Sequence, residues 1–553
     1  MNKIELLGKA AHICSKFVKD FDYEEVRREL QLADERVGGA LLADMEARDS
    51  EKTGKLKALM EILTSDGATR VYKGSIADHI YEYRYWLTFN YNNIIKPLLN
   101  PPAPSGNPRA EQLTRKFQYN QKHKTTTRWR KLTEGRSGTY LRMFFEFESS
   151  AAAASAKWMA DYMAHPEKCV YYGSGVPTEI IWAMGLTPYG INLQEAVRSQ
   201  DQKGSLYYLD ACSEAGVPLD TCTFPQIGAG AALRNDYLEG FPCAVLSNLT
   251  CDPMLASHAL TAKLLDVPTF YFDHPYRFRT PDGSRSFASQ MRDMVSFLEK
   301  HTGHTLDWDK LRDICDRYNQ MQEMELERWE HNYGPNPPIP GDLLLNMHLK
   351  LFGPFSGTED GLAMMKRQLE LTRAASAKGE SCVPNQQYRV VLWNPPPGSY
   401  WNFNNWISQC WGVNILNDME TFGNFEFIDT SSEETIFETL GRKTMYFTMS
   451  RHTRGDLKNF FDDLFKLCEL SKPDFIIQAD HVGCHPVNAL RGLLTEECAK
   501  RGLKLMRFEQ DLGDVRVTSH QGVRDQVNNF MTNVMNATPL KKSLMVFDDS
   551  NEW

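Results

Sequence analysis

The 553-residue sequence lacks several features that would assign it directly to a class of protein. It has no apolar run of roughly 18 residues or more, so no transmembrane helix is expected. Its formal net charge of −9 is opposite to that of general nucleic-acid binders, which carry a basic face. Charges interrupt the amphipathic N-terminal segment throughout, unlike the apolar region of a signal peptide. We therefore expect a cytoplasmic protein with neither nucleic-acid nor membrane partners.

Two common site motifs are also missing. No G-x-x-x-x-G-K-[ST] is present, and "GAGAAL" (228–233) is a poor match to the dinucleotide fingerprint. The chain has no C-x-x-C pair of the kind that zinc sites commonly use. The sequence therefore gives no motif for a nucleotide site or a paired-cysteine zinc site.

The chain is too long for a single hydrophobic core, so two or three domains are expected. Apolar residues at helical spacing dominate up to about residue 165, and short β-rich runs alternate with helical runs after it. This pattern predicts a helical N-terminal extension followed by two α/β domains with parallel sheets and a short tail. The predicted boundaries are 1–165, 166–380, 381–540 and 541–553. The clearest strands are expected at 243–248, 269–273, 388–394, 475–480 and 503–510.

Two segments repeat one βαβ pattern, with one copy in each α/β domain. Each has a strand, a short loop, a cysteine and then a proline, followed by a helix and a strand that ends in Asp. The prolines, Pro253 and Pro486, are expected in the first helical turn, where proline is tolerated. Cys251 and Cys484 are then expected at the carboxyl ends of strands, where open α/β sheets bind ligands.

The 12 cysteines divide into two groups by their surroundings. In a reducing compartment, metal-binding or catalytic roles are more common than disulfides. Cysteines within helix-periodic or apolar runs are expected to be small core residues: Cys14, Cys243, Cys315, Cys468 and Cys498. By contrast, Cys222, Cys251 and Cys484 lie among small or polar residues in predicted loops. Three such thiolates suit an iron–sulfur cluster with one iron left open, but their spacing alone also fits cysteines without a shared role.

Six motifs, in order, resemble those of the 2-hydroxyacyl-CoA dehydratase and benzoyl-CoA reductase superfamily. They are "GSGVPTEIIWAMGLTPYG" (173–190), "DTCTFPQIGAGAAL" (220–233), "SNLTCDPM" (247–254), "YFDHPY" (271–276), "ADHVGCHPVNALRGLL" (479–494) and "EQDLGDVRVTSHQGVRDQVNNFM" (509–531). The resemblance covers roughly residues 166–537 and leaves the N-terminal 165 residues unmatched.

The resemblance implies two Rossmann-like domains that face each other across a cluster-containing cleft. It makes Cys222, Cys251 and Cys484 the ligands of one 4Fe–4S cluster, with a fourth position for water or the substrate carbonyl. Ser174 matches a polar residue that the family places near the substrate. Many members have a glutamate near position 192, where this chain has Asn192, with Glu195 close by. Ser174 and Glu195 are therefore the candidate catalytic residues, and the departure at Asn192 leaves the identity of an acid or base open.

The implied function is the cluster-bearing, substrate-binding subunit of an activator-dependent (R)-2-hydroxyacyl-CoA dehydratase. One electron added to the thioester carbonyl of the CoA substrate would give a ketyl radical anion that expels the 2-hydroxyl. The implied partners are a homologous second cluster subunit and a separate ATP-hydrolysing iron–sulfur activator.

Two alternatives remain open from the sequence. "LFGPFSGTEDGL" (351–362) and "WNPPPGSYWNFNNW" (393–406) resemble the benzoyl-CoA reductase branch, which would make the chain a subunit of an ATP-dependent aryl-CoA reductase. The other alternative is a non-catalytic iron–sulfur or zinc scaffold. Glu179, in the first motif, fits either a surface or helix-capping role or a role in the site.

Overall fold

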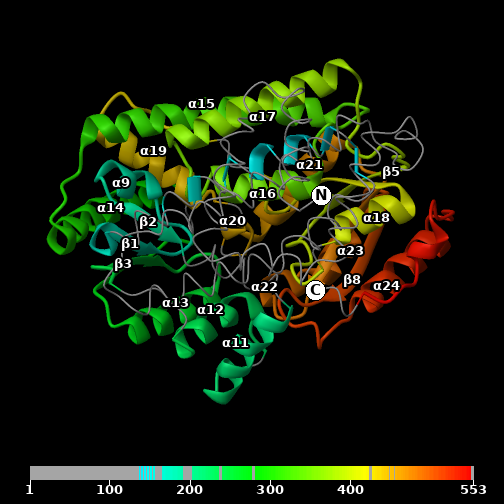
Figure 1. Cartoon of the computed structure of the whole chain (residues 1–553), viewed down its shortest axis with the longest axis horizontal. Helices are drawn as coiled ribbons and strands as arrows, with labels where there is room; N and C mark the ends of the chain where they lie inside the picture. Colours follow the sequence, from blue (N-terminus) through cyan, green and yellow to red (C-terminus); the bar gives the residue numbers. More distant parts are fainter. Residues whose placement is uncertain are drawn as a thin grey trace, which may run out of the picture. The chain divides into compact units, whose positions relative to one another are not determined.

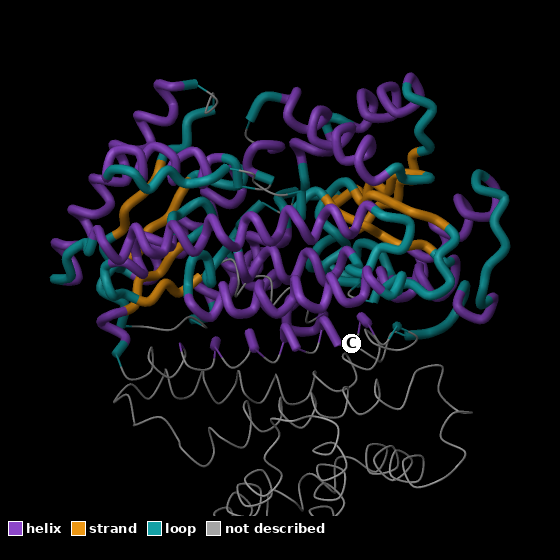
Figure 2. Tube along the Cα trace, turned by 90° about the horizontal axis from the view of Figure 1, so that it is seen from above, coloured by secondary structure: helices purple, strands orange, loops and turns teal. Residues whose placement is uncertain are grey.

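The computed structural model describes the chain from residue 165 to residue 549 with short gaps, together with individual residues between 136 and 158. The gaps are 191–201, 219, 236–239, 277–279, 401, 423–425, 448 and 454. The chain divides into two compact units, Met1–Thr125 with Gly135–Ala164, and Thr126–Glu134 with His165–Trp553. The helical extension predicted over 1–165 lies almost entirely outside the described residues. Both sheets belong to the second unit (Figures 1 and 2).

The first half of this unit is built on a four-stranded parallel sheet with the order β2-β1-β3-β4. Its strands are β1 (Cys169–Tyr172), β2 (Thr187–Gly190), β3 (Ala244–Ser247) and β4 (Thr269–Phe272). The elements around them are η2 (Pro166–Lys168), α9 (Thr178–Ala183), α11 (Gln202–Glu214), α12 (Thr223–Leu233), α13 (Asp252–Leu265) and α14 (Pro281–Thr302). The fold prediction is therefore confirmed for this half in its class and strand direction.

The second half repeats the arrangement with the order β6-β5-β7-β8, again fully parallel. Its strands are β5 (Tyr388–Leu392), β6 (Val413–Asp418), β7 (Phe475–His481) and β8 (Leu505–Gln510). Its helices are α18 (Phe403–Trp411), α19 (Glu433–Met445), α20 (Ser450–Thr453), α21 (Leu457–Ser471), α22 (His485–Asn488), α23 (Arg491–Lys500), α24 (His520–Asn533) and η3 (Lys542–Leu544). The two sheets appear as separate groups of strands in Figure 2.

Long helices connect the two halves. They are α15 (Trp308–Tyr333), α16 (Gly341–Leu351) and α17 (Glu359–Ala377). α15 and α17 run side by side (Figure 1), and α15 also packs against α9 of the first half and α21 of the second. No helix within the described residues is both long and apolar enough to cross a membrane.

The strand order places a topological switch point in each sheet. In the first sheet, the chain moves from β1 outward to β2 and then returns to the other side of β1 at β3. The second sheet does the same with β5, β6 and β7. Ligands in open α/β sheets bind outside the carboxyl ends of strands at such points. The loops after β3 and β7, which carry Cys251 and Cys484, are therefore equivalent positions in two copies of one design.

Burial explains why these central strands form where they do. Every residue of β3 and of β7 is buried, as is typical of parallel strands covered on both faces. Two apolar clusters cover the faces of the second sheet, one around Trp406 and Phe508 and the other around Trp393 and Phe460. The predicted prolines also lie in the first helical turn, Pro253 in α13 and Pro486 in α22.

One detail of the repeat differs from the sequence prediction. A single helix was expected after Cys484, as after Cys251, but the structure has a four-residue α22 and then a separate α23. The ends of the two helices are bridged by Asn488, Ala489 and Leu490, whose N–H groups bond to the carbonyl oxygens of the preceding turn. The second copy therefore has the same strand positions with a broken connecting helix.

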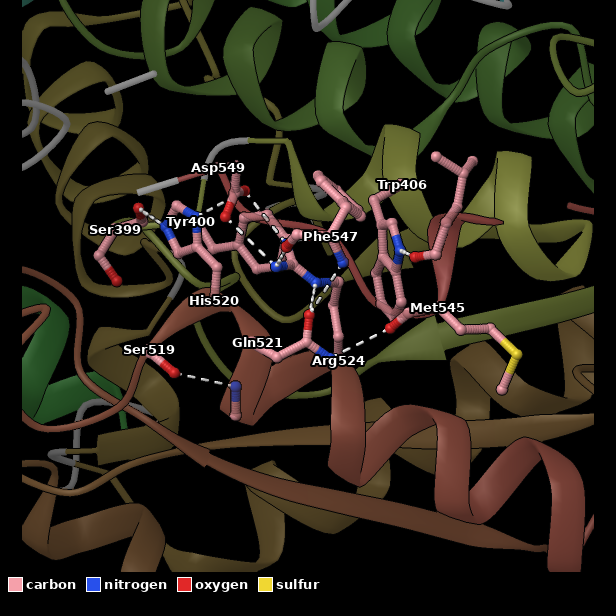
Figure 3. A network of polar contacts seen from close by, with 12 residues as sticks. Ser399, Tyr400, Trp406, Ser519, His520, Gln521, Arg524, Met545, Phe547 and Asp549 are labelled. Atoms are coloured by element: carbon pink, nitrogen blue, oxygen red, sulfur yellow. Dashed lines mark hydrogen bonds and ion pairs between the residues drawn. The ribbon is translucent and has the colours of Figure 1, made fainter. Parts of the chain in front are cut away.

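The predicted C-terminal tail is anchored at Asp549 (Figure 3). Arg524 donates to Asp549 at 3.1 Å and to the Tyr400 hydroxyl at 2.9 Å, and His520 Nδ1 lies 3.0 Å from Asp549 Oδ2. Burial alone would raise the pKa of Asp549, but its hydrogen bonds with His520 and Arg524 outweigh burial and hold the pKa at about 2. The segment after α24 is thus fixed to α24 itself by a buried ion pair.

We predict that Asp549→Asn lowers the stability of the protein by about 3 kcal/mol at neutral pH, because Arg524 would keep a buried charge without its partner. A carboxylate with a lowered pKa stabilises the fold above its unfolded pKa and loses this effect as the pH falls through its folded pKa. The difference between wild type and variant should therefore disappear between about pH 4 and the folded pKa of about 2. Urea unfolding at several pH values measures it.

Asp525→Asn is the matched control, since Asp525 is exposed on α24 and its Oδ1 accepts only a surface hydrogen bond from Gln521. It should shift stability by less than about 0.5 kcal/mol. Equal effects of the two substitutions would contradict the anchoring role of Asp549.

Candidate metal centre

Three cysteines differ in burial from the others in the described part of the chain. Cys222, Cys251 and Cys484 are half-buried, whereas the remaining eight are buried. The buried set includes four of the five predicted core cysteines, Cys243, Cys315, Cys468 and Cys498, while Cys14 lies outside the described residues. The division expected from sequence surroundings is therefore the division that burial shows.

Each of the three cysteines occupies the position just before a helix. Cys251 precedes α13, Cys484 precedes α22 and Cys222 precedes α12. Cys251 and Cys484 also follow the carboxyl ends of β3 and β7 closely. Cys222 does not follow a strand in the same way, because α11 lies between β2 and α12.

The structure brings the Cys484 loop against the Cys222 loop. A Cβ atom on Gly483 would lie 2.8 Å from Cα of Cys222 and 2.9 Å from the carbonyl oxygen of Thr221. Only glycine permits this approach without moving a backbone. Gly483 therefore fixes Cys484, its chain neighbour, beside Cys222 from the other half of the unit.

The Cys251 loop is also tied to the second half. Thr453, the last residue of α20, donates its hydroxyl to the carbonyl oxygen of Thr250 at 2.8 Å. Nearby, Ser205 of α11 donates to the carbonyl oxygen of Gly513 at 2.7 Å. All three cysteine-bearing loops therefore lie where the two halves of the unit meet.

Electrostatics places the three thiols in one neighbourhood. Burial raises the pKa of Cys222 well above its usual value, and the proximity of Cys251 and Cys484 raises it further. Burial likewise raises the pKa of Cys484 to about 11, with a smaller contribution in the same direction from Cys251. Thiols in such a site stay protonated without a cation, so a metal centre that binds here must displace their protons.

A histidine and an aspartate join the site from the second sheet. His481, at the end of β7, places Nε2 3.0 Å from Cys222 Sγ, and its Nδ1 lies 3.5 Å from Asp511 Oδ2. Asp511 Oδ1 accepts hydrogen bonds from Thr223 Oγ1 at 2.5 Å and from two backbone N–H groups, those of Gly513 and Asp514. The aspartate is thus fixed by both halves of the unit.

The sequence reasoning did not assign His481 or Asp511 to the site. Both lie within motifs that carried the resemblance, and Asp511 follows β8 directly. The missing signal is spatial: 259 positions separate His481 from Cys222 in the chain. No periodicity or local motif links residues so far apart.

A single metal ion and an iron–sulfur cluster require different arrangements of three cysteines. Among the described residues, no group of three His, Cys, Asp or Glu side chains is arranged to hold one metal ion. Three thiolates on one zinc must converge on a single point, with Zn–S bonds of about 2.3 Å. A cubane cluster instead binds each thiolate through a separate iron. Three neighbouring but unconverged cysteines fit the second arrangement.

The candidate catalytic residues are only partly placed. Ser174 is half-buried in the loop after β1, and its carbonyl oxygen accepts a hydrogen bond from the Ser247 hydroxyl. Glu195 and Asn192 lie outside the described residues. The structure therefore locates Ser174 at the switch point of the first sheet, next to the β3 end that leads to Cys251.

Glu179 is a core residue rather than a surface residue. It is 0% exposed, and its Oε1 accepts hydrogen bonds from Lys443 Nζ at 2.6 Å and from Ser356 Oγ at 2.5 Å. This buried ion pair connects α9 of the first half with α19 of the second. The surface alternative for Glu179 was wrong because the long connecting helices cover α9.

We predict that Gly483→Ala destabilises the protein by about 1–3 kcal/mol, because the added methyl group must push the Cys222 and Cys484 loops apart. The loosened contact should also speed alkylation of Cys222 by a maleimide. Urea unfolding and peptide mass spectrometry measure the two effects.

Gly492→Ala is the matched control, because a Cβ on this α23 residue meets nothing within 4 Å. Alanine in a helix is favoured over glycine by roughly 0.5–1 kcal/mol, so this variant should be neutral or more stable. If Gly483→Ala behaves like Gly492→Ala, the close loop contact is not a constraint.

Comparison with known proteins agrees with these features. The family model for the 2-hydroxyglutaryl-CoA dehydratase D-component matches residues 173–533, which include the second sheet, strands β2, β3 and β4 of the first sheet and all three half-buried cysteines. The chain is also similar to the lactoyl-CoA dehydratase subunit alpha of Anaerotignum propionicum, with 25% identity over 245 residues. That match covers 39% of this chain and 55% of the relative, so the chain spans about half the length of this curated relative. The chain belongs to the 2-hydroxyglutaryl-CoA dehydratase D-component family.

Proposed function

We propose that this chain is the cluster-bearing, substrate-binding subunit of an activator-dependent (R)-2-hydroxyacyl-CoA dehydratase. Cys222, Cys251 and Cys484 would hold one 4Fe–4S cluster, and the substrate would bind in a cleft at the carboxyl ends of the two sheets. A homologous second cluster subunit and an ATP-hydrolysing iron–sulfur activator would complete the enzyme.

The observation that carries this proposal is the meeting of three half-buried cysteines from loops of both halves of the unit. Their burial differs from that of every other described cysteine, and the charge of one affects the pKa of another. Three cysteines that neighbour one another from positions 222, 251 and 484 are difficult to explain as core packing. Family membership supports the dehydratase chemistry for this set.

The chain's own residues would bind and orient the groups around the cluster. A bound cluster would supply a low-potential electron and a Lewis-acidic iron. The close contact at Gly483 would keep the Cys222 and Cys484 loops at a fixed distance from each other. Ser174, beside the β3 loop, would face the substrate, and Glu195 is the candidate for moving a proton.

Buried amides at the same edge of the second sheet support a polar site. Both side-chain polar atoms of Gln478, Gln510 and Asn417 are buried and have no hydrogen-bond partner among the described residues. Buried amide groups need partners, and ordered water or a bound ligand would provide them. This edge is the one that carries His481 and leads to Cys484.

We predict that Cys222→Ser, Cys251→Ser and Cys484→Ser each reduce bound iron to less than half the wild-type content of about four per chain, the number in a 4Fe–4S cluster. Cys498→Ser is the matched control, because Cys498 is 1% exposed in an apolar cluster. Iron and acid-labile sulfide, measured after anaerobic reconstitution, test this. Full iron in all three loop variants would remove the cluster assignment, and zinc without sulfide would favour a zinc scaffold.

The reaction itself is tested by an anaerobic assay with the partner subunit, an ATP-dependent activator and a panel of CoA thioesters. Loss of water from a 2-hydroxyacyl-CoA is the expected result. Reduction of an aromatic acyl-CoA instead would favour the aryl-CoA reductase alternative, which the motifs at 351–362 and 393–406 suggest. Absence of both reactions with a full cluster present would contradict an enzymatic role.

A further inference from the structure

His481, a residue of the second sheet, contacts a proposed cluster ligand that belongs to the first half. Its Nε2 lies 3.0 Å from Cys222 Sγ, and the imidazole is 1% exposed. Its Nδ1 is buried and makes no hydrogen bond to a described residue. The contact with sulfur therefore joins this ring to the other half of the unit.

The carboxylate of Asp511 lies behind the ring, on its Nδ1 side. Asp511 Oδ2 lies 3.5 Å from Nδ1, and Asp511 is itself fixed by Thr223 and by backbone N–H groups. Thr223 directly follows Cys222, so the same short segment carries the sulfur and holds the aspartate. Rotation of the imidazole would also be opposed by its complete burial at the end of β7.

Cluster binding determines the direction of the hydrogen bond. A thiol can donate its proton to an imidazole nitrogen, but a thiolate bound to iron has no proton to donate. The contact can then persist only if Nε2 carries a hydrogen and donates it to sulfur. Hydrogen bonds to cluster sulfurs are among the factors that set reduction potentials.

Resting on the proposed cluster, we propose that His481 is a positioning and tuning residue that donates its Nε2–H to the Cys222 thiolate and makes the cluster easier to reduce. An N–H dipole directed at the sulfur stabilises the more negative, reduced cluster more than the oxidised one. The second half of the unit would thereby set the potential of a ligand from the first half. A purely structural histidine would affect folding but would leave the potential of a fully loaded cluster unchanged.

The test compares His481→Leu and His481→Gln with wild type in the full-length chain. Leucine fills similar space without a donor, and glutamine keeps an N–H donor at a comparable distance from the backbone. After anaerobic reconstitution, iron and sulfide content are measured first, and the midpoint potential is then measured by a reductive titration followed by electron paramagnetic resonance. His481→Leu should load iron but show a more negative midpoint, and His481→Gln should lie closer to wild type.

His485→Leu is the matched control. His485 directly follows Cys484, but it is exposed, and its imidazole makes no hydrogen bond to a described residue. Removing it eliminates an imidazole beside a proposed ligand without removing a bond to sulfur. Its midpoint should differ from wild type by less than that of His481→Leu.

The outcomes separate this inference from the proposed function. An unchanged midpoint in a fully loaded His481→Leu protein overturns the role of His481 and leaves the cluster assignment intact. Loss of the cluster in His481→Leu with retention in His481→Gln supports the donor, whereas loss in both variants overturns a donor-specific role. A wild-type chain that takes up no iron overturns the cluster assignment, and this inference with it.

Discussion

The contact between the backbones of Gly483 and Cys222 is the constraint on which the candidate site depends. It joins a loop after β7 to the start of α12, so two segments from different sheets are fixed at the distance of touching main chains. A flexible side-chain contact between the same loops would leave the two sulfurs free to separate. Direct contact between main chains prevents this separation, because main-chain atoms cannot move apart by a side-chain rotation. The hydrogen bonds from Thr223 to Asp511 and from Thr453 to Thr250 then fix the remaining loops relative to this point.

The two halves use one strand order, but they contribute unequally to the site. Both place a cysteine after the third strand of the sheet, which follows from the switch point between the first and third strands. The first half adds Cys222 through α12, whereas the second adds His481 from the end of β7. A third thiol and an imidazole thus occupy facing positions. The ion pair between Glu179 and Lys443 lies elsewhere and joins α9 to α19, a helix that packs against α14 of the first half.

The sequence predicts this architecture well where the pattern is local. The five strands expected from buried, β-rich runs all form, as β3, β4, β5, β7 and β8. Length does not explain the unassigned strands, because β1 and β2 have four residues each, as β3 and β4 do. β2 contains Pro188 and Gly190, which are depleted in strands, and β6 carries polar residues such as Asn414 and Asn417. The half-buried cysteines are identifiable from their polar loop surroundings. His481 is not, because its partner lies 259 positions away and only the fold brings the two together.

The burial of these cysteines between the two halves of the unit affects which side chains can lie beside the proposed cluster. Burial raises the pKa of Cys222 and Cys484, so these thiols are neutral without the proposed cluster, and no buried thiolate has to be stabilised. In the proposed site, negative charge would arrive only together with the iron that balances it. Hydrogen-bond donors that suit the site both with and without the proposed cluster are therefore neutral ones, such as backbone N–H groups and an imidazole N–H. A lysine or arginine against the sulfurs would instead bury an uncompensated positive charge whenever the cluster is absent. A neutral imidazole at the end of β7 would avoid this cost both with and without the proposed cluster.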